Sequence, residues 1–133
     1  MQYLLMCCFE EKAWNAIPDQ ERDKIMRDYG AWVDAVTAGG QYLAGGKLAP
    51  SAASTTVRVK NGKPLITDGP FAETREQLGG YHVVECKDLD EALALAARIP
   101  TLPVGGTIEV RPLAFSTTPG AGFNERERAA AMG

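Results

Sequence analysis

The sequence is short of histidine, of cysteine and of positive charge, and each shortage narrows what the protein can do. It has a single histidine, His82, and no Cys-x-x-Cys or His/Cys cluster, so we expect no metal site. A net charge of −3 leaves no concentrated basic surface for nucleic acid or an anionic membrane, so neither is an expected partner. The cysteines lie in apolar, strand-like stretches, which predicts buried, inert free thiols at Cys7, Cys8 and Cys86.

Long hydrophobic runs are also missing, which argues against a membrane-spanning segment. The N-terminal stretch lacks the basic flank and small-residue cleavage site of a signal peptide, so we expect a cytoplasmic protein. A chain of 133 residues with 45% hydrophobic residues has room for one core. After Phe115 the composition changes to Ser-Thr-Thr-Pro-Gly, so we expect one domain over residues 1–115 and a flexible tail over 116–133.

The hydrophobic patterns predict strands that alternate with helices. Residues 3–9 are apolar at nearly every position, as in a strand that is buried on both faces. Pro18 and the acidic residues after it predict a helix that runs to Ala38. Its apolar residues recur at helical spacing and form one stripe: Ile25, Tyr29, Trp32, Val33 and Val36. Residues 41–48 read as a strand in which Gly45-Gly46 predicts a bulge or the close approach of another backbone or a ligand.

A hairpin and a second strand–helix–strand unit follow. Residues 55–60 alternate polar with apolar side chains, and Asn61-Gly62 predicts a tight turn into residues 64–67. Residues 80–86 and 107–113 read as further strands. Asp88 predicts the cap of a helix that ends before Pro100, with an inward face made by Leu89, Leu93, Ala96 and Ala97.

This order of elements predicts an α+β fold of the ferredoxin-like, split βαβ type, with an antiparallel sheet and two helices on one face. The other face of such a sheet has no helices, yet residues 3–9 are apolar on both sides. A second copy of the sheet is the simplest cover, so we predict a homodimer packed sheet against sheet.

Residues 68–81 hold the most unusual local chemistry and carry a family likeness. They read D-G-P-F-A-E-T-R-E-Q-L-G-G-Y, and are followed by D-L-D-E-A-L at 88–93 and I-E-V-R-P at 108–112. Together these segments resemble the DGPF group of the YCII-related (YciI-like) family over roughly residues 1–113. The resemblance implies a dimeric α/β-barrel with a cleft in each protomer and no assigned activity. It also suggests a regulatory context beside sigma factors of the extracytoplasmic-function type.

One branch of that family has a His and Asp pair as its proposed catalytic centre, which directs attention to Asp68 and His82. Asp68 has two interpretations: it caps the turn at Gly69-Pro70, or it acts as a general base beside a cleft. His82 is either a half-exposed strand histidine, which we favour slightly, or a cleft acid or base. The sequence lacks a histidine in its first helix, so His82 is the one histidine that could take part in a His and Asp pair like that of this branch.

Polar residues on otherwise apolar strands are the candidates for substrate binding. Arg58, Glu109 and Arg111 would form either an ion-pair network at the dimer interface or a pocket for an anionic substrate, and we place the ion pair first. Tyr81 fits either the core or the lining of the cleft. Gly79-Gly80 lacks the spacing of a phosphate loop, and no cofactor is expected.

Two functions of different class remain open. The first is a cofactor-independent enzyme of small-molecule metabolism, with Asp68 and His82 as proton-transfer groups and Arg58 or Arg111 holding an anionic substrate. The second is a non-catalytic regulatory or interaction module that docks onto a partner such as a sigma factor, with the tail 116–133 as a contact segment. The polar residues of the predicted cleft favour the first slightly.

Overall fold

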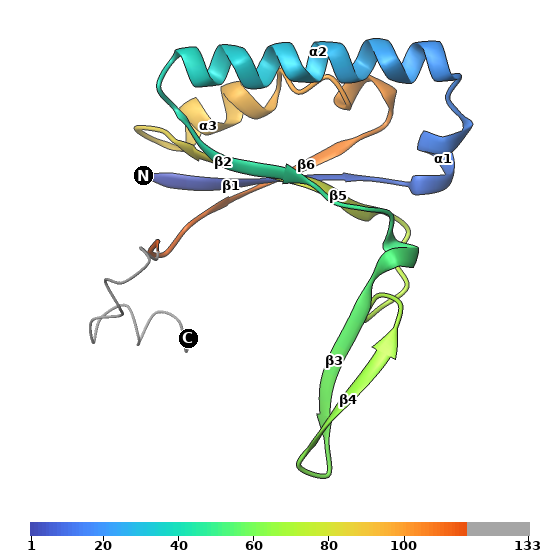
Figure 1. Cartoon of the computed structure of the whole chain (residues 1–133). Helices are drawn as coiled ribbons and strands as arrows, with labels where there is room; N and C mark the ends of the chain where they lie inside the picture. Colours follow the sequence, from blue (N-terminus) through green and yellow to red (C-terminus); the bar gives the residue numbers. More distant parts are fainter. Residues whose placement is uncertain (117–133) are drawn as a thin grey trace.

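A four-stranded antiparallel sheet carries the helices of the described chain on one of its faces (Figure 1). The computed structural model describes residues 1–116, so the predicted tail lies outside the described residues except for Ser116. The strand order is β2-β5-β1-β6, as in a ferredoxin-like sheet, the type of fold predicted above. The strands of this sheet are β1 (Gln2–Phe9), β2 (Tyr42–Lys47), β5 (Gln77–Glu85) and β6 (Thr107–Pro112).

The helices are close to their predicted positions, with one addition. Two of them, α2 (Asp19–Ala38) and α3 (Leu89–Ala96), are the expected pair. The Asp88 side chain accepts a hydrogen bond from the Glu91 backbone N–H and caps α3, as predicted. The addition is α1 (Glu11–Ala16), a short helix that leads from β1 towards α2 and that the hydrophobic pattern does not predict. Two short 3₁₀ turns complete the fold, η1 (Ser51–Ala53) and η2 (Leu102–Val104).

The core lies between the sheet and the helices. Alternate residues of β1 are buried, because successive side chains of a strand point to opposite faces. The predicted stripe of α2 covers them, and Trp32 donates a hydrogen bond from Nε1 to the Leu95 carbonyl of α3 at 3.0 Å. This bond ties the two helices together above the sheet. The buried residues of the core are Tyr3, Leu5, Cys7, Trp32, Val36, Val84, Cys86, Ala92, Leu95, Ala96 and Ile99.

The predicted inward face of α3 is correct at Ala96, which is buried, and wrong at its other three residues. Leu89 and Leu93 are 47% and 45% exposed, and Ala97 is exposed as well. Leucine and alanine occur all round this short helix, so spacing alone did not fix which side faces the sheet. Small alanines let the helix approach the strands closely, and longer side chains fill the space beside them. The true inward face is Ala92, Leu95, Ala96 and Ile99.

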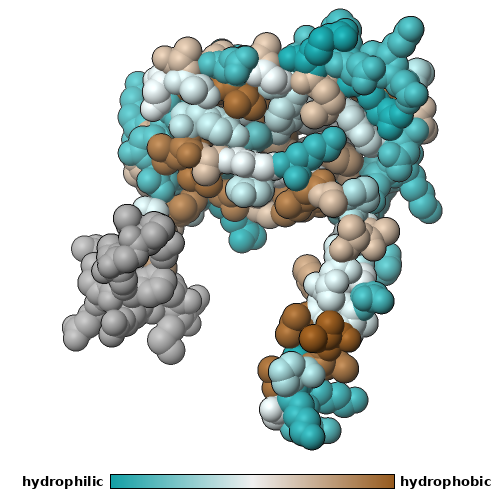
Figure 2. Space-filling model, viewed as in Figure 1, coloured by the Kyte–Doolittle hydropathy of each residue, from teal (hydrophilic) through white to brown (hydrophobic). Residues whose placement is uncertain are grey.

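The second sheet is a two-stranded hairpin, β3 (Thr55–Lys60) and β4 (Lys63–Asp68), which we call the arm. It projects from the sheet on the side opposite the helices (Figure 1). Asn61 and Gly62 both have positive φ, as the predicted tight turn requires. Alternation puts Val57, Val59, Pro64 and Ile66 on one face of the arm, and Figure 2 shows apolar surface gathered there.

The sheet face opposite the helices is open in the described chain. Its central side chains, including Leu4, Met6 and Val83, are only half-buried. The arm descends from the edge of this face, so two uncovered apolar surfaces lie on the same side of the molecule (Figures 1 and 2). No helix within residues 1–116 is long and apolar enough to cross a membrane.

Candidate functional site

His82 lies on the covered face of β5, beneath α2. Its side chain is 3% exposed, so the favoured interpretation of a half-exposed strand histidine is wrong. The reason is register: His82 shares its face with Val84, and that face is the one that α2 covers. Three aromatic rings surround the imidazole, with centroid distances of 5.0 Å to Trp32, 5.4 Å to Tyr29 and 5.5 Å to Tyr42.

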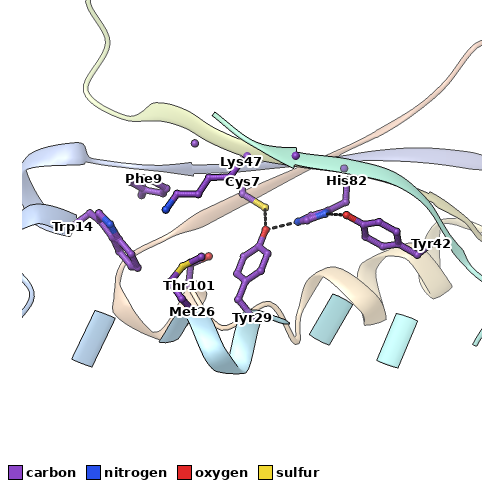
Figure 3. Close-up of a pocket in the computed structure, with 13 residues that line it drawn as sticks. Cys7, Phe9, Trp14, Met26, Tyr29, Tyr42, Lys47, His82 and Thr101 are labelled. Carbon is purple, nitrogen blue, oxygen red and sulfur yellow. Dashed lines mark hydrogen bonds between the residues drawn. The ribbon is translucent and has the colours of Figure 1, made fainter. Parts of the chain in front are cut away.

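Both nitrogens of the imidazole are hydrogen-bonded to tyrosine hydroxyls (Figure 3). Nδ1 contacts the Tyr42 hydroxyl at 2.7 Å, and Nε2 contacts the Tyr29 hydroxyl. The Tyr29 hydroxyl in turn lies 3.2 Å from Cys7 Sγ. The four side chains come from four different elements, β1, α2, β2 and β5, and form one continuous chain of polar atoms. We call Cys7, Tyr29, His82 and Tyr42 the relay chain.

Burial keeps every member of the relay chain neutral near pH 7. It lowers the pKa of His82 to about 4, because the charged imidazolium loses its hydration. Burial also raises the pKa of Tyr29, and the neighbouring Cys7 adds to that increase. The pKa values of Tyr42 and Cys7 are raised mainly by burial too. A neutral imidazole has one N–H donor and one acceptor nitrogen, so one tyrosine donates to His82 while the other accepts from it.

The relay chain forms part of the wall of a cavity of about 260 Å³. The rest of the wall is mainly apolar or aromatic, and it includes backbone from β2 and β5. An engineered apolar cavity of about 150 Å³ binds benzene, so this space is large enough for a substituted ring. The lining residues are Cys7, Phe9, Trp14, Met26, Tyr29, Tyr42, Gly45, Gly46, Lys47, Gly79, Gly80, His82 and Thr101.

Glycines let side chains of the cavity wall pack directly against the backbone at two points. A Cβ at Gly45 would lie 1.9 Å from the Tyr42 hydroxyl and 2.7 Å from His82 Nδ1, so only glycine leaves that hydrogen bond intact. A Cβ at Gly79 would lie 2.3 Å from the Phe9 ring. Of the two alternatives predicted for Gly45-Gly46, the close approach of another backbone is confirmed, because a Cβ at Gly45 would lie 2.8 Å from the Tyr81 carbonyl oxygen. The register shift between β2 and β5 lies just before this pair, between Tyr42 and Ala44.

One end of the cavity carries a positive charge. Lys47 is the one charged residue in the described lining, and Figure 3 shows its side chain extending towards Phe9 and Trp14. Trp14, Met26 and Lys47 also border a more polar hollow that contains Asp19, Arg22 and Asp23. We infer that the cavity communicates with solvent on this side. The site therefore combines a cation near its mouth with a neutral relay chain deeper inside.

The family comparison agrees with the fold. A model of the YCII-related domain matches residues 1–115. The chain belongs to the YCII-related family. This YCII-related chain is 37% identical over 116 residues to an uncharacterized protein of Rhizobium meliloti (strain 1021), which covers 86% of this chain and 94% of that one.

A solved structure with a similar fold is 5-chloro-2-hydroxyhydroquinone dehydrochlorinase (TftG) from Burkholderia phenoliruptrix AC1100, in complex with 2,5-dihydroxybenzoquinone. The TM-score is 0.50 with 13% sequence identity, and the match covers 87% of the YCII-related chain and 96% of the other. At this identity the likeness shows the fold alone.

Of the residues predicted for the site, only His82 lines the cavity. Tyr81 lies on the opposite face of β5, beside Gly46. On β6, Arg111 Nε and Glu109 Oε2 form an ion pair at 2.8 Å, and both side chains are exposed. The last two candidates belong to the arm: Asp68 is exposed at the end of β4, and Arg58 donates from Nη2 to the Phe71 carbonyl at 2.8 Å.

Sequence reasoning missed three-quarters of the relay chain in this YCII-related protein. The sequence predicts Tyr29 as a core residue and Cys7 as a buried, inert thiol, and it indicates no role for Tyr42. The hydroxyl of Tyr29 and the thiol of Cys7 do pack in the core, but both also line the cavity. The useful signal was Gly45-Gly46, because the missing Cβ of Gly45 marks the position where Tyr42 and His82 meet.

Proposed function

We propose that this protein binds a small anionic, ring-containing metabolite in the cavity and catalyses a proton transfer on it without a cofactor. One observation carries the proposal: a neutral, buried histidine has both nitrogens bonded to tyrosine hydroxyls that line a ligand-sized cavity. Small-molecule sites are typically apolar cavities with a few precisely placed polar groups. The cavity and the relay chain have this character.

The simpler interpretation is a core histidine whose hydrogen bonds are satisfied. Burial of a polar side chain with two partners is common, and it requires no ligand. The cavity argues for more than this, because about 260 Å³ of space lies beside His82 and both of its tyrosine partners. A structural histidine gains nothing from empty space beside its partners, since unfilled volume costs stability.

The anionic character of the ligand rests on Lys47. It is the charged group of the described lining, and an ammonium near an apolar space attracts a carboxylate or an ionised hydroxyl. The ring-like character rests on Phe9 and Trp14, whose centroids are 5.6 Å apart and which border the cavity near Lys47. The fold neighbour TftG binds a hydroxylated quinone, a ligand of the same chemical class, and this adds modest support.

Of the remaining candidates, we retain His82 as a proton-transfer group and leave Asp68 as a prediction. Asp68, Arg58, Glu109, Arg111 and Tyr81 lie on the arm or the open face, outside the lining of the cavity within one chain. A role for them in substrate binding would need a second chain to bring them to a cavity.

We also propose that two chains form a homodimer that packs across the open sheet face. Half-buried apolar side chains on that face and the exposed apolar face of the arm support it, because large uncovered apolar surfaces mark contact sites. An isolated two-stranded hairpin is only marginally stable in water, so the arm needs a partner surface. Static light scattering on the purified chain should give twice the mass of one chain.

We also propose that the chain belongs to the DGPF group and is a cytoplasmic protein. The Asp68-Gly69-Pro70-Phe71 segment supports the first assignment, and Gly69 has a positive φ there, as a turn glycine does. A sigma factor remains an alternative partner. The observation that favours such an interaction module is the exposed apolar face of the arm, on which a protein other than a second copy could dock.

Binding is testable with the two tryptophans of the chain as reporters. Trp14 lines the cavity, whereas the Trp32 indole is buried and bonded to Leu95. Titration with 3-phenylpropionate, which has a ring and a carboxylate, should shift the Trp14 indole N–H signal in NMR spectra more than that of Trp32. Equal shifts, or none, would count against a ligand in this cavity.

Lys47→Met provides the test of charge. Loss of the ammonium should weaken binding of 3-phenylpropionate by roughly tenfold, about 1.4 kcal/mol. Lys87→Met is the matched control, because it removes the same charge at an exposed position outside the cavity lining. If the two variants bind 3-phenylpropionate with equal affinity, the proposal that the cavity prefers an anionic ligand is wrong.

A further inference from the structure

The hydrogen bonds of the relay chain can point in either direction along it. Simple binding of a ligand does not need this property. A tyrosine hydroxyl has one donor and two acceptor sites, and a neutral imidazole has one of each. In one state Tyr29 donates to Nε2 of His82 and Nδ1–H donates to Tyr42. In the other state Tyr42 donates to Nδ1 and Nε2–H donates to Tyr29. The observed contacts are compatible with both states.

The two tyrosines that flank His82 in this chain face the same space. Tyr29 and Tyr42 both line the cavity, on opposite sides of His82 (Figure 3). In the first state the Tyr42 hydroxyl hydrogen is free for a ligand, and the Tyr29 oxygen still has an acceptor site. A ligand that reaches both hydroxyls can therefore give a proton at one end and receive one at the other.

We propose that Tyr29, His82 and Tyr42 form a bifunctional proton relay that interconverts the keto and enol forms of a small oxo acid with an apolar ring. This inference rests on the proposed function, because it needs a ligand in the same cavity. Lys47 holds the carboxylate, the aromatic end of the cavity holds the ring, and the relay acts on the enolisable carbonyl. The substrate class follows from these three chemical requirements.

The proton balance of the step closes without any ionised intermediate. The enol O–H of the ligand gives its proton to the Tyr29 oxygen, and the Tyr29 hydroxyl hydrogen passes to Nε2. The Nδ1 hydrogen of His82 passes to the Tyr42 oxygen, and the Tyr42 hydroxyl hydrogen passes to the ligand carbon. One O–H bond of the ligand breaks and one C–H bond forms, with the electron pair moving through the enol double bond. Each side chain gives one proton and takes one.

A charge-neutral relay suits this site for a physical reason. Burial disfavours the imidazolium and both tyrosinates, so a stepwise mechanism would create an unpaired charge in an apolar space. Lys47 is the other titratable group of the described lining, and the Cys7 thiol beside Tyr29 is held neutral by burial. Concerted transfer avoids the charge altogether.

Phenylpyruvate is a suitable probe, because it combines an aromatic ring, a carboxylate and an enolisable ketone. The ketonisation of its enol can be followed by ultraviolet absorbance with wild-type protein, Tyr29→Phe and Tyr42→Phe. Each substitution removes one hydroxyl and keeps the ring, so each should lower the catalysed rate by roughly 100-fold or more. Tyr3→Phe is the control, since Tyr3 is buried outside the cavity lining, and its rate should equal that of wild type.

Two further readouts separate a relay from a single acid or base. A concerted relay moves several protons in one step, so the rate should fall along a curved line as the deuterium fraction of the solvent rises. Transfer by one group alone would give a straight line. Binding of 3-phenylpropionate, which lacks the ketone, should survive both tyrosine substitutions.

The outcomes distinguish the relay from the binding proposal. Loss of the catalysed rate in both variants, with binding retained, supports the relay. A rate that survives in either variant, or no catalysis by wild type despite bound phenylpyruvate, overturns the relay and leaves the cavity as a binding site. Failure of both compounds to bind overturns the substrate class and also counts against the proposed function.

Discussion

The polar side chains on the two faces of the main sheet differ in charge and in exposure to water. On the covered face, His82 and its tyrosine partners are neutral, buried and hydrogen-bonded to one another. On the open face, Glu109 and Arg111 are charged, exposed and paired in contact with water. Exposed ion pairs contribute little to stability or specificity, typically about 0.2–1 kcal/mol, whereas a buried network is costly to disturb.

This difference changes where chemistry is expected. The conspicuous charged residues of the sequence, Arg58, Asp68 and Arg111 among them, lie on the open side or on the arm. The less conspicuous tyrosines and glycines build the enclosed site on the other side. In this chain the enclosed environment comes from burial and convergence of neutral groups, and the charged residues lie on the exposed side.

The prediction with the largest expected effect tests the proposed dimer contact on the open side of the sheet. Ile66 is 67% exposed on the apolar face of the arm, and Ile66→Asp would place an unpaired charge in the proposed dimer interface. We expect dimer dissociation to be favoured by roughly 100-fold or more, about 3 kcal/mol, measured by analytical ultracentrifugation.

The neighbouring residue gives a matched control for that prediction. Thr67 lies on the other face of the same strand, so Thr67→Asp adds the same charge without entering the apolar face. We expect it to change the dissociation constant by less than about fivefold, on the order of 1 kcal/mol. An undiminished dimer with Ile66→Asp would show that the arm is not part of the contact.

The second prediction tests the covered side through pH. The pKa of His82 is about 4 in the folded chain and about 6.5 in the unfolded chain. Above about pH 6.5 both states are neutral and stability is unaffected. As the pH falls from about 6.5 to about 4, only the unfolded state binds the proton, so the folded state loses stability. Urea unfolding should show a loss of roughly 2 kcal/mol between pH 7 and pH 5 that is attributable to His82.

His82→Gln supplies the comparison, because it keeps a polar side chain that does not titrate. The difference between the stability curves of wild type and the variant should shrink by about 2 kcal/mol on going from pH 7 to pH 5. If the difference in unfolding free energy between wild type and His82→Gln stays constant over this range, His82 has an ordinary pKa. Burial on the covered face would then affect its polar groups less than the structure indicates.

The third and smallest prediction compares two adjacent glycines. Gly45→Ala would drive a Cβ into the Tyr42–His82 hydrogen bond, so we expect a loss of about 1–2 kcal/mol in unfolding free energy. A Cβ at Gly46 points to the open side and meets only the Tyr81 ring, at 3.3 Å. Gly46→Ala should cost less than about 0.5 kcal/mol in the same measurement. Equal costs would contradict the tight packing assigned to the covered side.

The parts of the fold that were predicted depend on local sequence. Asn61-Gly62 specifies its own turn, Asp88 caps its own helix, and the apolar stripe of α2 is regular over its length. The inward face of α3 could not be predicted in the same way, because leucine and alanine occur on all sides of this helix. Only its contact with the sheet determines which side is buried.

The candidate site was the hardest part to predict, since it depends on register between distant segments. Tyr29 and Tyr42 lie 53 and 40 residues from His82 in the chain, and a bulge after Tyr42 helps to set which side chains of β2 face it. A one-residue change of register would put His82 on the open face. Sequence spacing favoured Asp68 because it is near His82 along the chain, but proximity along the chain did not bring the two into one cavity.

The root of the arm joins two segments of the cavity wall. The chain leaves the sheet after Lys47 and returns before Gly79, and the Leu48 N–H donates to the Gly79 carbonyl at 2.9 Å. A partner chain that bound the arm, as proposed above, would therefore also restrain the backbone beside the cavity. By thermodynamic linkage, any factor by which a ligand tightens the association of two chains must be the factor by which association tightens ligand binding. If two chains associate through the arm, as proposed above, the measured affinity of a ligand for this cavity will depend on the protein concentration.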